Sequence, residues 1–153
     1  MGQKDIFKSG CQVLVNPVNC VGVMGKGLAL QFKNKYFNMY LEYRRDCLKQ
    51  KGSYRRYTPG CCNTYFTDNN TVIANIATKN HWMDKSKYEW VQKGIHELHE
   101  IMTAMNYKSV AIPRIGCGLG GLEWNKTKEI ILNETKNAKY TIWLDGEIIE
   151  PKK

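Results

Sequence analysis

The chain has 153 residues with 23 Lys and Arg against 14 Asp and Glu, which gives a formal net charge of +9. This length favours one domain with a substantial hydrophobic core, and we expect residues 1–153 to form it. No apolar run is long enough to span a membrane, and the N-terminus lacks the apolar core of a signal peptide. We therefore expect a cytoplasmic monomer with no membrane partner, and the positive charge favours polyanionic ligands.

The predicted elements follow from two periodicities, since short apolar runs between turn signals predict strands and a 3.6-residue period predicts helices. In chain order we expect a strand at 11–15, helices at 28–35 and 39–49, paired strands at 61–66 and 71–76, a helix at 87–106, a strand at 109–112, a helix at 126–134, a strand at 140–143 and an exposed basic tail at about 146–153. This alternation predicts an α/β fold, a three-layer α/β/α sandwich with a mixed, mostly parallel central sheet.

Two glycine-rich loops each follow an apolar run, at residues 16–27 and 113–124. Successive free N–H groups in such loops form a concave, partly positive site for anions, above all phosphate. Ligands of α/β sheets bind beyond the carboxyl ends of the strands, so both loops should face one cleft. The ligand expected there has phosphate in its middle and a group recognised at each end.

Neither loop fits a more common nucleotide motif well. Gly116, Gly118 and Gly121 do spell G-x-G-x-x-G, which keeps a dinucleotide-binding unit as an alternative. The chain that follows is too short for a second βαβ half, and no acidic residue ends a later strand at the usual distance. In the first loop Gly27 replaces the Ser or Thr that holds magnesium in a P-loop.

Cysteine and histidine spacing indicates no metal site. The six cysteines form no C-x-x-C pair, and His96 and His99 are one residue too close for an H-E-x-x-H motif. We expect reduced thiols, solvated histidines and neither a metal nor a cofactor. Nucleic acid is a further expected partner, because tyrosines are interleaved with basic residues over 43–57.

Four segments together carry a resemblance to the macro domain, the ADP-ribose-binding α/β/α module. They are Lys4-Asp5-Ile6-Phe7, Asn19 with Met24-Gly25-Lys26-Gly27-Leu28-Ala29, Ala77-Thr78-Lys79-Asn80-His81-Trp82, and Ile112 to Trp124. The chain most resembles the branch that contains the terminal ADP-ribose protein glycohydrolase and the DNA ADP-ribosyl glycohydrolase antitoxins.

The resemblance implies roles for individual residues. Asp5 and Ile6 would bind adenine, Asn19 and the first loop would hold the distal ribose, the second loop would wrap the diphosphate, and Trp143 would stack on adenine or else lie in the core. The implied ADP-ribose-binding residues are Asp5, Ile6, Asn19, Gly22, Val23, Met24, Gly25, Gly27, Ile115, Gly116, Cys117, Gly118, Leu119, Gly120 and Trp143.

The resemblance also implies that Lys79 and Asn19 are catalytic. An amine attacks an anomeric carbon only when it is neutral, so the pKa of Lys79 must be lowered by desolvation or by a cation such as His81 or Lys85. One departure matters: Gly120 stands where the protein-directed enzyme has an acidic residue. This brings the chain closer to the DNA-directed branch.

The implied function is hydrolysis of the bond between ADP-ribose and a modified macromolecule, either an ADP-ribosylated DNA base or a protein carboxylate. Two alternatives stay open. The same cleft would serve a phosphatase acting on ADP-ribose 1''-phosphate, and it would also serve a reader that binds ADP-ribose without chemistry.

Overall fold

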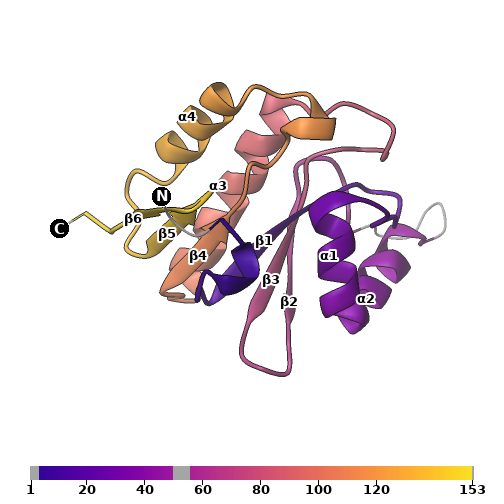
Figure 1. Ribbon diagram of the computed structural model, residues 1–153, viewed down its shortest axis with the longest axis horizontal. Helices are drawn as coiled ribbons and strands as arrows, with labels where there is room; N and C mark the ends of the chain where they lie inside the picture. The colour runs from indigo at the N-terminus through magenta and orange to yellow at the C-terminus, as the bar shows by residue number, and fades with distance from the viewer. Residues whose placement is uncertain (1–3, 50–55, 153) are drawn as a thin grey trace.

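The computed structural model describes residues 4–49 and 56–152 (Figure 1). Its elements are η1 (Ile6–Lys8), β1 (Val13–Val18), α1 (Gly27–Lys35), α2 (Phe37–Cys47), β2 (Cys62–Phe66), β3 (Val72–Ala77), α3 (Tyr88–Ala104), β4 (Ser109–Ile112), η2 (Gly118–Gly120), α4 (Trp124–Glu134), β5 (Thr141–Leu144) and β6 (Glu147–Ile149). Within this part of the chain no helix is long and apolar enough to cross a membrane.

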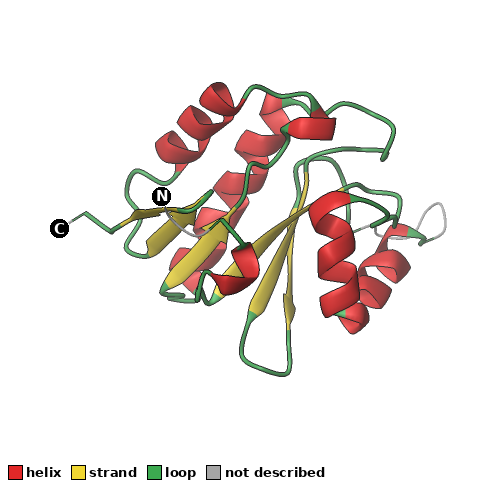
Figure 2. Ribbon diagram, viewed as in Figure 1, coloured by secondary structure: helices red, strands yellow, loops and turns green. Residues whose placement is uncertain are grey.

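The six strands form one sheet in the order β2-β3-β1-β4-β5-β6 (Figure 2). The four inner strands run parallel, and β2 and β6 pair antiparallel at the two edges. The predicted mixed, mostly parallel sheet is therefore confirmed. Because the inner strands are parallel, the segments that follow β1, β3 and β4 all leave from the same edge of the sheet.

Alternation along the strands separates two apolar layers. Val13 and Val15 of β1 point into the core under α3 and α4, whereas Leu14 and Val18 point into the core under α1 and α2. Figure 1 shows these two helix pairs on opposite sides of the sheet. Helix α3 buries one apolar face against the sheet. Met105 at its C-cap is exposed.

The predicted C-terminal tail is wrong in part, because residues 147–149 form strand β6 and pair with β5. Asp145 (φ +47°) and Gly146 (φ +91°) form the two-residue turn between these strands. Positive φ at both turn positions matches the right-handed twist of a hairpin, and Asp-Gly is a common pair there. This dipeptide was the sequence signal that predicts the edge strand.

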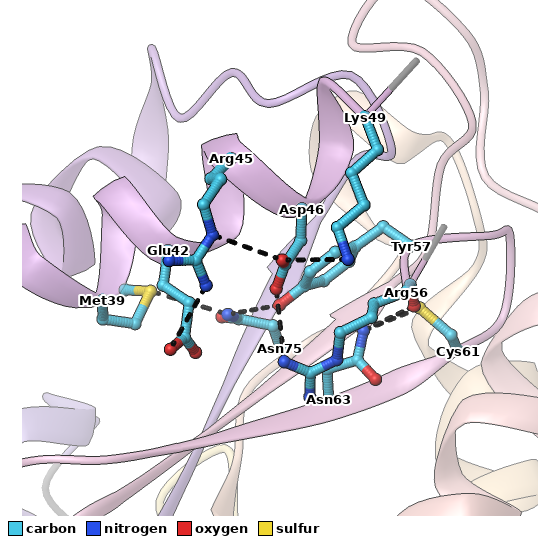
Figure 3. A network of polar contacts seen from close by, with 10 residues as sticks. All are labelled: Met39, Glu42, Arg45, Asp46, Lys49, Arg56, Tyr57, Cys61, Asn63 and Asn75. Carbon is cyan, nitrogen blue, oxygen red and sulfur yellow. Dashed lines mark hydrogen bonds and ion pairs between the residues drawn. The ribbon is translucent and has the colours of Figure 1, made fainter. Parts of the chain in front are cut away.

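In the basic segment at 43–57, which was expected to bind nucleic acid, several described side chains make contacts within the protein. Asp46 has a side chain only 3% exposed, and Arg45, Lys49 and Arg56 all lie within ion-pair distance of its carboxylate (Figure 3). Tyr57 is buried and accepts a hydrogen bond from Asn75. Residues 50–55 of the segment lie outside the described residues. The positive charge at Arg45, Lys49 and Arg56 thus compensates a buried carboxylate.

The two histidines of α3 differ. His96 is exposed and contacts Glu134, as a solvated residue would. His99 is half-buried with Nδ1 2.6 Å from the Tyr140 hydroxyl, so the expectation of a solvated side chain is wrong for it. All six cysteines are free thiols, and burial raises the pKa of Cys20 to about 12.

Candidate active site between the two glycine loops

A cavity of about 570 Å³ lies at the carboxyl ends of β1, β3 and β4. Its wall comes from three segments, each of which follows one of these strands. It is lined by Pro17, Val18, Asn19, Val23, Gly25, Lys26, Gly27, Leu28, Ala29, Thr78, Lys79, Trp82, Ser86, Pro113, Arg114, Gly116, Cys117, Leu119 and Gly120. The prediction that both glycine loops face one cleft is confirmed, and the cleft also contains Lys79.

The first loop is folded around the Asn19 side chain. Asn19 Oδ1 accepts from the Val21 and Val23 N–H groups, and its Nδ2 donates to the Val23 carbonyl at 2.8 Å. From α2, the Tyr43 hydroxyl lies 2.9 Å from the Asn19 carbonyl and 2.8 Å from Oδ1. Asn19 is only 7% exposed, and it keeps one amide hydrogen beyond these contacts. Its main observed role is to shape the loop.

Tyr43→Phe tests this anchoring. The change removes a hydroxyl from a side chain only 1% exposed and leaves Asn19 with fewer donors. We expect a loss of about 1–2 kcal/mol in the free energy of unfolding. Urea denaturation measures this loss. Tyr40→Phe is the control, because it also removes one hydroxyl from helix α2, and the contact of the Tyr40 ring with the Lys33 ammonium does not need that hydroxyl. Equal and negligible losses in both variants would contradict the anchoring role.

The second loop depends on close packing that only glycine allows. A Cβ at Gly116 would lie 2.7 Å from Leu122 Cδ1, and its φ of +77° is strained for any other residue. Gly118 also has positive φ, but it does not line the cavity. A Cβ at Gly120 would lie 2.6 Å from Ser86 Oγ. The Ser86 hydroxyl thus takes the space that an acidic side chain at position 120 would need.

Lys79 lies on a segment held by both loops. The Cys20 N–H donates to the Asn80 carbonyl at 2.9 Å, which ties the segment to the first loop. The Ser86 N–H donates to the Gly120 carbonyl at 2.9 Å, which ties it to the second loop. The Lys79 ammonium donates to the Trp82 carbonyl at 3.4 Å. Backbone contacts on both sides therefore fix the position of the lysine in the cavity.

The surroundings of Lys79 lower its pKa. Desolvation by burial is the largest cause, and repulsion from the Lys85 ammonium adds to it, while Asp84 opposes both. Of the two cations that the sequence offered, Lys85 thus acts on Lys79. His81 instead accepts the Met83 N–H at Nδ1. A lowered pKa raises the share of neutral amine near neutral pH, which is the form that a nucleophile needs.

Several predicted site residues lie away from the cavity wall. Ile115 is fully buried in the core, and Met24 is 1% exposed beside Asn16. Gly22 packs against Arg44, whose guanidinium donates to its carbonyl. Trp143 is 3% exposed within the core under α1 and α2, so the structure corrects its expected role: the ring does not present a face for adenine.

Asp5 and Ile6 lie outside the cavity wall as well. Asp5 is the N-cap of η1, and its Oδ1 accepts the Phe7 N–H at 3.0 Å. Ile6 is 4% exposed and packs in the core under α1 and α2. Their roles toward adenine stay predictions.

Ten wall residues were not among the predicted site residues: Pro17, Val18, Lys26, Leu28, Ala29, Thr78, Trp82, Ser86, Pro113 and Arg114. Trp82 is half exposed on the segment that carries Lys79. The Arg114 guanidinium lies over the Trp124 ring and donates to Asp145 at 2.7 Å. For Thr78 and Trp82 the adjacent Lys79 was the available signal. Nothing in the sequence pattern singled out Ser86.

Comparisons with known proteins agree with this geometry. A "DNA ADP-ribosyl glycohydrolase" of Mycobacterium tuberculosis is 36% identical over 132 residues, which are 86% of this chain and 37% of the relative. The chain therefore spans less than half the length of that relative.

Two solved structures are similar over most of the chain. The macrodomain of Mycobacterium tuberculosis DarG superposes with a TM-score of 0.86 at 31% identity, over 99% of this chain and 96% of that one. Thermosipho africanus DarTG in complex with ADP-ribose gives 0.81 at 29% identity, over 90% of this chain and 38% of that one. The family description that matches residues 15–131 is "Macro domain". The fold, the two glycine loops and these likenesses lead to one conclusion: the chain belongs to the macro domain family and is related to the DarG DNA ADP-ribosyl glycohydrolases.

Proposed function

We propose that this macro domain binds ADP-ribose and hydrolyses the bond that joins it to a modified DNA base. The observation that carries the proposal is the position of Lys79, in a cavity whose wall includes residues of both glycine loops. The relatives described as DNA ADP-ribosyl glycohydrolases support the choice of reaction and substrate.

The cavity suits a ligand with a diphosphate between two ribosides. Helix α1 begins at Gly27, and no side chain caps its N-terminus, so its first N–H groups are available to an anion at the cavity wall. The second loop supplies the opposite wall through Gly116 to Gly120. Diphosphate between these walls would place the distal ribose toward Lys79.

In the reaction we propose, the bond between the anomeric carbon of the distal ribose and the base breaks. The base leaves with a proton, and water supplies the hydroxyl that ends on the anomeric carbon. The neutral amine of Lys79 attacks this carbon as the bond to the base breaks, and the proton that its nitrogen loses goes to the departing base. Water then attacks the same carbon, the bond to the Lys79 nitrogen breaks, and a proton from the water restores the amine. The lowered pKa of Lys79 favours the neutral form. Asn19 supports the site by holding the first loop in shape.

Gly120 favours the DNA-directed reaction over the protein-directed one. An acidic residue there would displace Ser86, whose hydroxyl lies 2.6 Å from the position of a Cβ at Gly120. Any side chain at position 120 would therefore force the Ser86 hydroxyl to rotate away and would lie 3.2 Å from its Cβ. This contact concerns the same position, Gly120, at which the sequence departs from the protein-directed enzyme.

Parallel assays separate the proposed reaction from the other open functions. ADP-ribosylated single-stranded DNA, ADP-ribosylated glutamate and ADP-ribose 1''-phosphate are offered side by side, with release of ADP-ribose or phosphate followed over time. We expect the DNA substrate to be hydrolysed fastest. Preference for the 1''-phosphate would favour the phosphatase, and tight binding of ADP-ribose with no turnover would favour the reader.

The neighbours of Lys79 give opposite shifts in the pH dependence of turnover. Turnover that needs the neutral amine rises with pH through the pKa of Lys79. Lys85→Gln removes a repelling charge, raises that pKa and moves the rise to higher pH. Asp84→Asn removes an attracting charge and moves the rise to lower pH. Profiles of kcat that move in the same direction would contradict the role of the neutral amine.

A further inference from the structure

A second cavity, shallow and open to solvent, adjoins the first and is lined largely by the segment between β3 and α3, whose course Figure 1 shows. Its wall includes Asn80, Asp84, Lys85, Ser86, Lys87 and Trp90. Ser86 lines both cavities, so the second cavity begins beside the residues that face Lys79. The proposed reaction involves no residue of this cavity except those that it shares with the first cavity or that act on Lys79.

Ser86 is where the two cavities meet, and its hydroxyl has no partner. The residue is 6% exposed, and its Oγ makes no hydrogen bond to any described residue. Its backbone N–H is used by the Gly120 carbonyl, so the segment itself is well held. Native proteins rarely leave a buried hydroxyl without a partner, because its desolvation is then uncompensated. The hydroxyl has almost no accessible surface, so Ser86 forms part of the wall between the two cavities and is not itself a ligand contact.

The charges on the wall favour an anionic ligand with flat rings. Lys85 and Lys87 supply two ammonium groups against the single carboxylate of Asp84. The Lys87 ammonium lies 5.0 Å from the centre of the half-buried Trp90 ring. Cations beside an aromatic ring are the combination that binds single-stranded nucleic acid, through the phosphates and by stacking of bases.

We propose that the second cavity binds the polynucleotide strand next to the modified base, and that the strand passes over Ser86 from one cavity to the other. This rests on the proposed function, because the ADP-ribose must lie in the first cavity for the strand to reach the second. Lys85 and Lys87 bind the phosphates, and Trp90 stacks on a neighbouring base.

A binding experiment tests the strand site without turnover. The Lys79→Ala protein is titrated with a single-stranded oligodeoxynucleotide that carries one ADP-ribosylated base, with free ADP-ribose, and with a peptide ADP-ribosylated on glutamate. Lys87→Gln and Trp90→Ala are added to this background. Lys87 is preferred to Lys85 because Lys85 also acts on the pKa of Lys79. Lys108→Gln is the matched control, since Lys108 is exposed and precedes β4 at the opposite edge of the sheet.

We expect Lys87→Gln to weaken oligonucleotide binding about threefold or more and to lower the salt slope of log Kd by about one. Trp90→Ala should weaken it about fivefold or more through the lost stacking. Free ADP-ribose and the modified peptide should bind all variants within about twofold, which also shows that the variants fold.

Equal effects of Lys87→Gln and Lys108→Gln on the oligonucleotide would overturn the strand site, as would an equal loss for the modified peptide. Absence of turnover in the wild type is a separate result. It would contradict the proposed hydrolysis, whereas a selective loss of oligonucleotide binding in Lys87→Gln would still support the strand site.

Discussion

Lys79→Ala should remove most turnover and leave the affinity for ADP-ribose nearly unchanged. Lys79 lies in the shared cavity, desolvation and Lys85 lower its pKa, and the proposed reaction gives its amine a role in the transition state. Interactions made only in the transition state appear in kcat and not in ground-state binding. We expect kcat to fall about 100-fold or more, with Kd for ADP-ribose within a few fold. Single-turnover assays and calorimetry measure the two quantities.

Lys79→Arg separates nucleophilic action from simple charge attraction. A guanidinium stays protonated at every relevant pH, so arginine should not restore turnover if the neutral amine reacts. If the lysine only attracts an anionic substrate, arginine would restore activity, and high salt would mimic the loss in the alanine variant. Recovery in Lys79→Arg would therefore contradict the proposed role.

Gly25→Glu should abolish binding of ADP-ribose. Gly25 lines the cavity just before α1, and a Cβ there would make only an ordinary contact of 3.6 Å with Val23. The new carboxylate would face the diphosphate at the N-terminus of the helix, where two like charges close together repel by several kcal/mol when partly shielded from water. We expect affinity to fall about a thousandfold, which leaves no binding detectable at ordinary ligand concentrations. In the wild type, ADP-ribose at a hundredfold excess over Kd should add about 2.7 kcal/mol of stability.

Gly25→Gln is the control, because glutamine has the same size without the charge. Thermal unfolding with and without ADP-ribose compares both variants with the wild type. A much smaller loss of affinity in Gly25→Gln than in Gly25→Glu would show that repulsion between the glutamate and the diphosphate causes the loss. Stabilisation by NAD in place of ADP-ribose would favour the dinucleotide-binding alternative that the sequence left open.

The sequence could predict the loops and their common cleft because both features are local. Glycine positions, strand ends and the parallel alternation place residues 16–27 and 113–124 at one sheet edge without knowledge of packing. The role of Lys79 came from resemblance, and the structure adds the physical reason for its lowered pKa. The Asp145-Gly146 dipeptide is a local hairpin signal from which strand β6 could have been predicted.

Other features depend on contacts between distant segments and could not be read from a pattern. Arg56 meets Asp46 across the segment between α2 and β2, so its charge only looks free in the sequence. Ser86 packs against Gly120, which is more than thirty residues away in the sequence, so the sequence alone does not indicate this contact. Trp143 could be a stacking or a core residue by sequence, and the pairing of β5 inside the sheet decides for the core.

In the proposed function, the cavity between the two glycine loops removes ADP-ribose from DNA. The most direct measurement incubates the wild-type protein and Lys79→Ala with an ADP-ribosylated single-stranded oligonucleotide and identifies the products by mass. The wild type should release ADP-ribose and the unmodified oligonucleotide in equal amounts, and Lys79→Ala should release almost none. An oligonucleotide that stays fully modified with the wild type, or equal release by both proteins, would contradict the account.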